Sequence, residues 1–234
     1  MPERPQSTAT LRLSAGDLRV VHDVTVPSDA VAAREVVPAL QKLINAVVAT
    51  AETMSADGGK PISCRKGCGA CCRQLVPISR TEGERLADIV RALPAGRRAR
   101  VEKRFEEAAT RIERAGLWPT NGRSDREISL GYFALGVPCP FLEDESCSIH
   151  AERPLICREY LVTSPAELCA GPAQEGVTPV AVPKFSAAAR KMQDEGDEWF
   201  PLALLTRQKK KAGETRPGTE WIQRFLKAFS KPTG

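Results

Sequence analysis

The first clear hydrophobic pattern of the chain lies near its amino terminus, where apolar and polar residues alternate. Residues 11–13 and 18–26 follow this two-residue period, and Ser14, Gly16 and Asp17 between them are typical turn residues. Alternation places successive side chains on opposite faces of a strand. The pattern therefore predicts a β-hairpin within residues 10–26.

A helical period replaces the alternation from residue 29 onwards. Apolar residues recur three and four positions apart as far as residue 54, and Ser28 and Asp29 are suitable N-cap residues. We expect a helix over residues 29–54. Pro38 either kinks this helix or marks its true first turn, because proline lacks the N–H that an interior turn needs. Gly58 and Gly59 follow as a stop signal.

Two further helices are predicted after the first group of cysteines. Ser79 and Thr81 are N-cap candidates for one helix, which Pro94 ends. A strongly charged helix is expected over residues 97–115, with Gly116 as its C-terminal cap. The narrow apolar stripe of this second helix is typical of a helix that covers a core with one face.

The pattern is weaker in the second half of the chain. We expect residues 117–126 to form a loop, whereas the apolar residues 128–135 fit a helix or a strand. The remaining expectations are a strand over 177–182, a short helix over 186–194, a linker over 209–218 and an amphipathic helix over 221–229.

These elements together predict a mainly α-helical fold with irregular cysteine-rich loops and a small N-terminal β-hairpin, with β structure as the minor part. We expect three parts along the chain. They are an N-terminal tail and hairpin over residues 1–27, a helical cysteine-cluster domain over 28–205 with its motifs between 64 and 169, and a basic linker with the C-terminal helix over 206–234.

Composition places the chain among globular proteins. Of its 234 residues, 42% are hydrophobic and 27% are charged, which is far from the composition of a disordered chain. No segment approaches the ~20 apolar residues of a membrane span, and residues 1–10 lack the features of a secretory signal. We therefore expect a cytoplasmic protein with no membrane partner. The net charge of +5 lies in local runs such as residues 209–211, so we do not expect nucleic-acid binding.

The eight cysteines carry the strongest chemical signal. In a reducing compartment, clustered cysteines indicate metal or redox chemistry more often than disulfides, and thiolates prefer zinc, copper(I) or iron–sulfur units to calcium or magnesium. Gly67 and Gly69 allow the backbone to fold round an ion, which a set of merely buried cysteines would not require. The first group comprises Cys64, Cys68, Cys71 and Cys72, and the second comprises Cys139, Cys147, Cys157 and Cys169.

The adjacent pair Cys71 and Cys72 needs a separate interpretation. Neighbouring side chains point in different directions and rarely bind one ion together. One of the pair therefore binds a second metal, bridges two metals or remains a free thiol. Eight thiolates are enough for two four-coordinate zinc sites, but a polynuclear iron site fits the same count.

Three charged or titratable residues lie within the second group. His150 is either a ligand or a partner of a ligand, or it is a surface or packing histidine. Arg153 and Arg158 flank Cys157, where they either lower its pKa and hydrogen-bond its sulfur or form ion pairs with Glu152 or Glu159. The sequence leaves these alternatives open.

At these segments the chain resembles the YkgJ-type cysteine-cluster family, which is described as the CxxCxxCC zinc- or iron-chelating domain. The resemblance implies that all eight cysteines are metal ligands. The first spacing differs, because three residues separate Cys64 from Cys68 where the family pattern has two. Four ordered blocks carry the resemblance, namely Cys68–Arg73, Cys139–Leu142, Cys147–His150 and Arg153–Tyr160.

Three functions are therefore considered. The first is a metal-binding protein that holds zinc or iron, with an iron–sulfur centre as one form. The second is an iron–sulfur-dependent enzyme, because the family includes a flagellin lysine N-methylase associated with such a centre. The third is a basic protein-interaction module that binds a protein partner through the apolar face of the C-terminal helix. The chain has no nucleotide-binding glycine loop, and with only two histidines it offers no Ser-His-Asp set.

Overall fold

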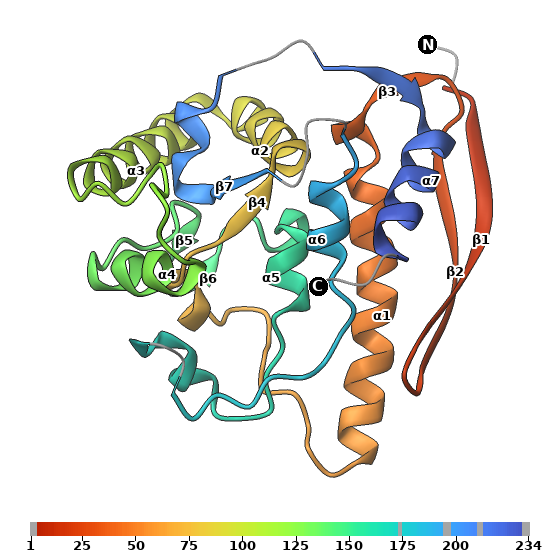
Figure 1. Cartoon of the computed structure of the whole chain (residues 1–234), viewed down its shortest axis with the longest axis horizontal. Helices are drawn as coiled ribbons and strands as arrows, with labels where there is room; N and C mark the ends of the chain where they lie inside the picture. Colours follow the sequence, from red (N-terminus) through yellow and green to blue (C-terminus); the bar gives the residue numbers. More distant parts are fainter. Residues whose placement is uncertain (1–3, 173–174, 194–197, 210–212, 231–234) are drawn as a thin grey trace.

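The computed structural model describes residues 4–172, 175–193, 198–209 and 213–230. Within them the structure is mainly α-helical with a minor β part, which confirms the predicted fold class. Figure 1 shows the hairpin and the C-terminal helix on one side of the molecule, the second to fourth helices on the other, and the cysteine-rich loops below and between them. None of the described helices is long and apolar enough to cross a membrane.

The N-terminal hairpin forms as predicted and is longer than the pattern indicated. Strands β1 (Gln6–Ala15) and β2 (Leu18–Pro27) pair antiparallel, with Leu13 opposite Val20. Gly16 in the turn has a φ of 58°, a conformation that glycine adopts without strain. The alternate residues of β2 are buried against helices α1 (Val37–Asp57) and α7 (Gly218–Phe229), and the other face of the hairpin is largely exposed.

Helix α1 (Val37–Asp57) begins eight residues later than the helical period indicated. Pro38 lies in its first turn, so the second of the two alternatives for this proline is confirmed. The preceding residues form strand β3 (Ala30–Ala32), a 3-10 turn η1 (Ala33–Glu35) and the N-cap. Strand β3 pairs with β8 (Thr215–Pro217), a distant segment whose hydrogen bonds outweigh the local helical preference.

Two hydrophobic cores organise the molecule. The first lies between the hairpin, α1, α6 (Phe185–Arg190) and α7. The second lies between α2 (Arg80–Ala92), α3 (Ala95–Arg114) and the segments around strand β4 (Pro77–Ser79) and the 3-10 segment η6 (Leu202–Arg207). Fully buried side chains in the first core include Leu40, Leu43, Ile44, Leu155, Phe185 and Phe225, and those in the second include Ile78, Val101, Phe105, Ile112 and Phe141.

The helices of the second core follow their sequence signals. Helix α2 (Arg80–Ala92) begins at Ser79, whose hydroxyl accepts a hydrogen bond from the backbone N–H of Glu82. Helix α3 (Ala95–Arg114) ends before Gly116, which has a positive φ of 61°. Short strands β4 (Pro77–Ser79) and β7 (Trp199–Pro201) pair antiparallel, and the 3-10 segment η6 (Leu202–Arg207) follows β7 and packs on α3.

The apolar segment 128–135 is helical. It belongs to α4 (Asp125–Ala134), in which the side chains and backbones of Ser124 and Glu127 cap each other. A capping box of this kind satisfies two donors of the first turn, and the segment is therefore stable as a helix despite its short length. The loop expected over residues 117–126 is two residues shorter, because Asp125 and Arg126 form the first turn of α4.

Three expectations for the C-terminal third need correction. Residues 177–182 form only an isolated bridge between Pro179 and Val162, because Pro179 has no N–H for a ladder. Helix α6 (Phe185–Arg190) ends earlier than expected, and position 194 lies outside the described residues. The linker expected over 209–218 contains strand β8, while residues 210–212 lie outside the described part.

The C-terminal amphipathic helix is confirmed as α7 (Gly218–Phe229). Its apolar face packs against α6 and the hairpin, and Trp221 and Phe225 are almost completely buried. The indole N–H of Trp221 donates a hydrogen bond of 2.8 Å to the backbone oxygen of Val31. Packing within the chain thus accounts for the apolar face that suggested a protein partner.

Candidate metal centre

The two cysteine groups lie far apart in the sequence and meet at the junction of the two cores. The first group occupies the loop after α1 and the 3-10 turn η2 (Ala70–Arg73), and the second runs through β5 (Leu142–Glu143), β6 (Ser146–Cys147), η3 (His150–Glu152), α5 (Leu155–Glu159) and η4 (Ala166–Ala170). Cys64 packs against the first core, whereas Cys72, Cys139 and Cys147 belong to the second or pack on it. The cysteine segments therefore join the two cores.

Backbone and side-chain hydrogen bonds hold the groups together. The N–H of Cys139 donates to the carbonyl oxygen of Cys72 at 2.7 Å, and the N–H of Ser63 donates to that of Val162 at 2.8 Å. The side-chain amide of Gln74 donates to the carbonyl oxygens of Cys169 and Gly171, both at 2.9 Å. These bonds fix the register between the groups without using any thiol.

Glycine is required where the first group meets the β5–β6 hairpin. A Cβ atom at Gly69 would lie 2.5 Å from the backbone oxygen of Glu145 and 2.6 Å from a methyl group of Leu142. The hairpin turn is itself tight, with positive φ at Asp144 and Glu145, and an ion pair of 2.6 Å joins Glu145 to Arg73. The backbone of the first group thus lies directly against the hairpin that ends at Cys147.

All eight cysteines are free thiols, and their electrostatic influence on each other divides them into two overlapping sets. Beyond the effect of burial, Cys68 raises the pKa of both Cys64 and Cys169, and Cys169 raises that of Cys64. Cys139 and Cys147 raise the pKa of Cys157. Burial is the largest cause that raises the pKa of Cys139 to about 12 and of Cys157 well above its usual value. These buried thiols ionise only when a nearby cation compensates the negative charge of the thiolate.

Cys71 lies between the two sets and raises the pKa of thiols in both. Its own pKa is lowered to about 7, first by a hydrogen bond from the Cys72 thiol and further by the positive charge of Arg153. The pKa of Cys72 is raised as the donor of that bond and by burial. Cys71 is therefore the thiol that ionises most readily near neutral pH.

The arginines near Cys157 have different environments. Arg158 is 3% exposed, and its guanidinium donates to the carbonyl oxygens of Arg153 and Ala151 and to the side-chain oxygen of Asn45. Burial lowers its pKa to about 10. Arg153 acts through its charge and lowers the pKa of Cys71, Cys147 and Cys157.

The ion-pair interpretation of these arginines is therefore wrong for the described residues. Glu152 pairs instead with Arg85 at 3.2 Å, and Glu159 accepts hydrogen bonds from the backbone and hydroxyl of Ser186. His150 is half-buried, and burial followed by the charge of Arg153 lowers its pKa. A neutral imidazole is the form that a metal ligand requires.

The donor chemistry of this region fits zinc or iron. The thiols of the two distant segments influence one another through Cys71, and the charge of Arg153 acts on thiols of both groups. Soft thiolates prefer these metals. No three His, Cys, Asp or Glu side chains among the described residues surround a common point closely enough to form a ready cage. Ligation would therefore need side-chain rearrangement within the gathered group, since the backbone hydrogen bonds already hold the segments.

Sequence reasoning missed two contributors to this region. Gln74 joins both groups through its amide, as described above. The hydroxyl of Tyr160 is buried without a hydrogen bond of normal geometry, yet it lies close enough to the Cys169 thiol to lower the pKa of that thiol as a donor would. Their nearness to cysteines in the sequence was the only available signal.

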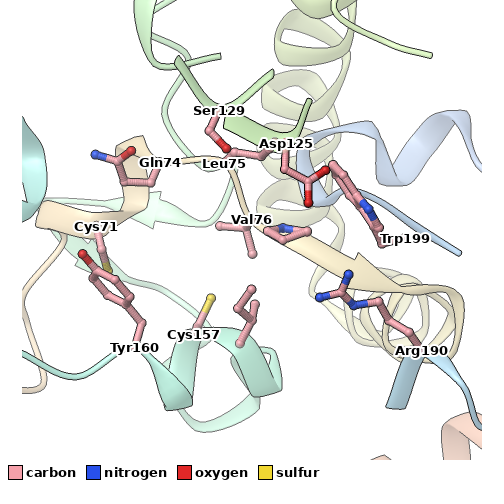
Figure 2. A pocket seen from close by; sticks show the side chains of 12 residues that line it. Cys71, Gln74, Leu75, Val76, Asp125, Ser129, Cys157, Tyr160, Arg190 and Trp199 are labelled. Carbon is pink, nitrogen blue, oxygen red and sulfur yellow. The ribbon is translucent and has the colours of Figure 1, made fainter. Parts of the chain in front are cut away.

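A cavity of about 260 Å³ adjoins the thiols (Figure 2). Cys71, Cys157 and Tyr160 line one end, and Arg190 and Trp199 line the other. The lining comes from η2, β4, α4, α5, α6 and β7, which are dispersed over most of the chain. No sequence motif therefore indicated it.

Fold and site together define a cysteine-rich protein in which two thiol groups are held at the junction of two helical cores. Residues 63–175 match the model of the CxxCxxCC family, whose description is "putative zinc- or iron-chelating domain". The match covers the segment in which the cysteine motifs resemble that family. No curated protein and no solved structure matches the chain.

Proposed function

We propose that the protein binds zinc or iron through the thiolates of both cysteine groups. The observation that carries the proposal is the direct backbone hydrogen bond between Cys139 and Cys72, which brings together two cysteine groups separated in the sequence by helices α2, α3 and α4. Buried thiols with raised pKa values are stabilised as thiolates by a metal cation. The family description of residues 63–175 supports the same chemistry.

The two thiol sets support the assignment of ligands to two neighbouring positions. Cys64, Cys68 and Cys169 would serve one position, and Cys72, Cys139, Cys147 and Cys157 would serve the other. Cys71, which influences both sets, would complete the first position or bridge the two. His150 would be a ligand or a hydrogen-bond partner of one, and Arg153 would balance thiolate charge.

A metal at this junction would also stabilise the fold. Cys64 packs on the first core and Cys139 belongs to the second, so an ion held by both groups would link the cores. Structural zinc sites contribute their binding free energy to folding. We also propose a cytoplasmic location, because the eight free thiols need a reducing compartment to persist.

The alternative is an iron–sulfur-dependent enzyme, of the kind suggested by the flagellin lysine N-methylase. The cavity favours this alternative, because it leads to Cys71 and Cys157 and would give a small molecule access to the centre. A structural metal site needs no such access, and it is usually closed by its four protein ligands.

Purification without oxygen, followed by elemental analysis and a visible absorption spectrum, tests the proposal. About two zinc ions per chain and no colour would support structural thiolate sites. Brown protein with iron and acid-labile sulfide would support the iron–sulfur alternative. Folded protein with neither metal, which also fails to take up either on anaerobic reconstitution, would refute the proposal.

Variants connect the bound metal to the cysteines. Cys139→Ser should lose at least half of the metal, since Cys139 is buried in the centre of the second set. Ser63→Ala is a matched control in the first loop, because it removes a hydroxyl that bonds only to the backbone oxygen of Thr163. The control should retain its full metal content.

A further inference from the structure

The cavity beside the thiols is lined by an arginine side chain that has an unused hydrogen-bond donor. The Nε atom of Arg190 is buried and has no hydrogen-bond partner among the described residues. Figure 2 shows its guanidinium pointing into the cavity towards Val76. A buried donor without a partner is costly, and an arginine matches a carboxylate in both charge and geometry.

Among the described residues, the nearby acidic groups form no ion pair or hydrogen bond with this arginine. Glu82 is close enough for the charge of Arg190 to lower its pKa, but burial raises that pKa overall. Its carboxylate oxygens accept hydrogen bonds from the N–H of Leu155 and from Ser79. Asp125 lines the cavity and is exposed, and no ion pair joins it to Arg190 within the described part of the chain. An anion entering the cavity would therefore meet an available guanidinium.

The remaining walls suit an apolar body. Val76, Pro77 and Ile156 line the cavity. The indole of Trp199 lies at the Arg190 end (Figure 2), and its ring centroid is 5.1 Å from that of Trp118. The volume of about 260 Å³ exceeds the ~150 Å³ that suffices for benzene in an engineered apolar cavity. A single aromatic ring with a short polar group therefore fits.

We propose that this cavity binds a small organic carboxylate with an apolar body about the size of one aromatic ring. The carboxylate pairs with Arg190, and the body lies between Val76 and Trp199. The far end of the molecule then points to Cys71 and Cys157, so the ligand lies beside the region that we assign to metal. The anchor is an arginine, and binding is therefore independent of the proposed function of the thiols.

Isothermal titration calorimetry of the full chain with benzoate, benzyl alcohol and benzylamine tests the charge requirement. These probes share a ring and differ in the polar group. Benzoate should bind with a dissociation constant below about 10 mM, and both other probes should bind at least tenfold more weakly. Equal binding of benzylamine and benzoate, or no binding of benzoate, would overturn the proposal.

Variants locate the bound probe. Arg190→Gln should weaken benzoate binding at least tenfold, while Arg100→Gln, at an exposed arginine on α3 outside the cavity, should leave it unchanged. Val76→Phe fills the cavity from the opposite wall and should abolish binding without changing the charge. Circular dichroism establishes that each variant is folded, and the Val76 variant still decides the outcome if the Arg190 variant does not fold. Undiminished benzoate binding by a folded Arg190 or Val76 variant would overturn the proposal.

The same titrations on metal-loaded and chelator-treated protein separate the two proposals. Binding that persists without metal and depends on Arg190 supports the carboxylate site, whatever the metal content shows. Binding that disappears with the metal and is unaffected by Arg190→Gln would mean that benzoate coordinates the ion, and it would overturn the carboxylate site while leaving the metal proposal intact.

Discussion

Replacement of Gly69 by alanine tests how the first cysteine group is positioned. The added Cβ would lie 2.5 Å from the backbone oxygen of Glu145 and 2.6 Å from a side-chain carbon of Leu142. A leucine methyl group can rotate away, but a backbone oxygen in a tight turn cannot. The substitution must therefore push the first group and the β5–β6 hairpin apart.

The expected cost follows from these contacts. Overpacking in a tight interior region costs about 1–3 kcal/mol, and the backbone contact places Gly69→Ala in the upper half of that range. For a chain of this size, 2 kcal/mol corresponds to a decrease of about 4–8 °C in Tm. The hairpin carries Cys147, so metal content should fall as well.

Two other glycines provide matched controls. Gly96→Ala adds a Cβ at an exposed position in the first turn of α3 with no atom nearer than 3.9 Å, and it should change stability by no more than about 0.5 kcal/mol. Gly67→Ala has no close contact but requires a positive φ of 90°, and it should destabilise through backbone strain alone. Urea unfolding and elemental analysis measure both effects. A Gly69→Ala protein with the stability and metal content of the wild type would refute the reasoning.

Three further predictions concern buried polar groups. Burial raises the pKa of Glu159 to about 7, so between pH 4.5 and 7 the folded chain binds more protons than the unfolded chain, and its stability should fall as pH rises through this window. Urea midpoints across the window should show this slope, and Glu159→Gln, which mimics the protonated form, should flatten it; an unchanged slope would contradict the assignment. Arg158→Lys should lower the free energy of unfolding in urea by about 2–3 kcal/mol, because a lysine cannot donate to three separated acceptors. An effect as small as that of the exposed control Arg100→Lys would show that these hydrogen bonds contribute little. Ser79→Ala should cost about 1–2 kcal/mol, more than the exposed cap variant Ser124→Ala, and the reverse order in thermal unfolding would disprove the role of burial.

Local signals in the sequence determined several parts of this structure. Alternating residues fixed the hairpin, helical periodicity fixed the centre of α1 and α3, and Ser79 marked the start of α2. The cysteine spacing identified the family segment, which the comparison with the family model confirms. Each of these depends on residues within a few positions of one another, and the sequence pattern therefore contains the information directly.

Only the tertiary structure decided how distant segments act on each other. Helix α1 begins later than the sequence pattern predicted because β3 pairs with β8. The apolar face of α7 is buried within the chain because α6 and the hairpin cover it. The division of the chain at residues 27 and 205, and the assignment of individual cysteines to metal positions, stay predictions. The joining of Cys72 to Cys139, the burial of Arg158 and the cavity at Arg190 arise from contacts between segments far apart in the chain. Sequence spacing contains no measure of such distances, because packing brings these segments together only when the cores form.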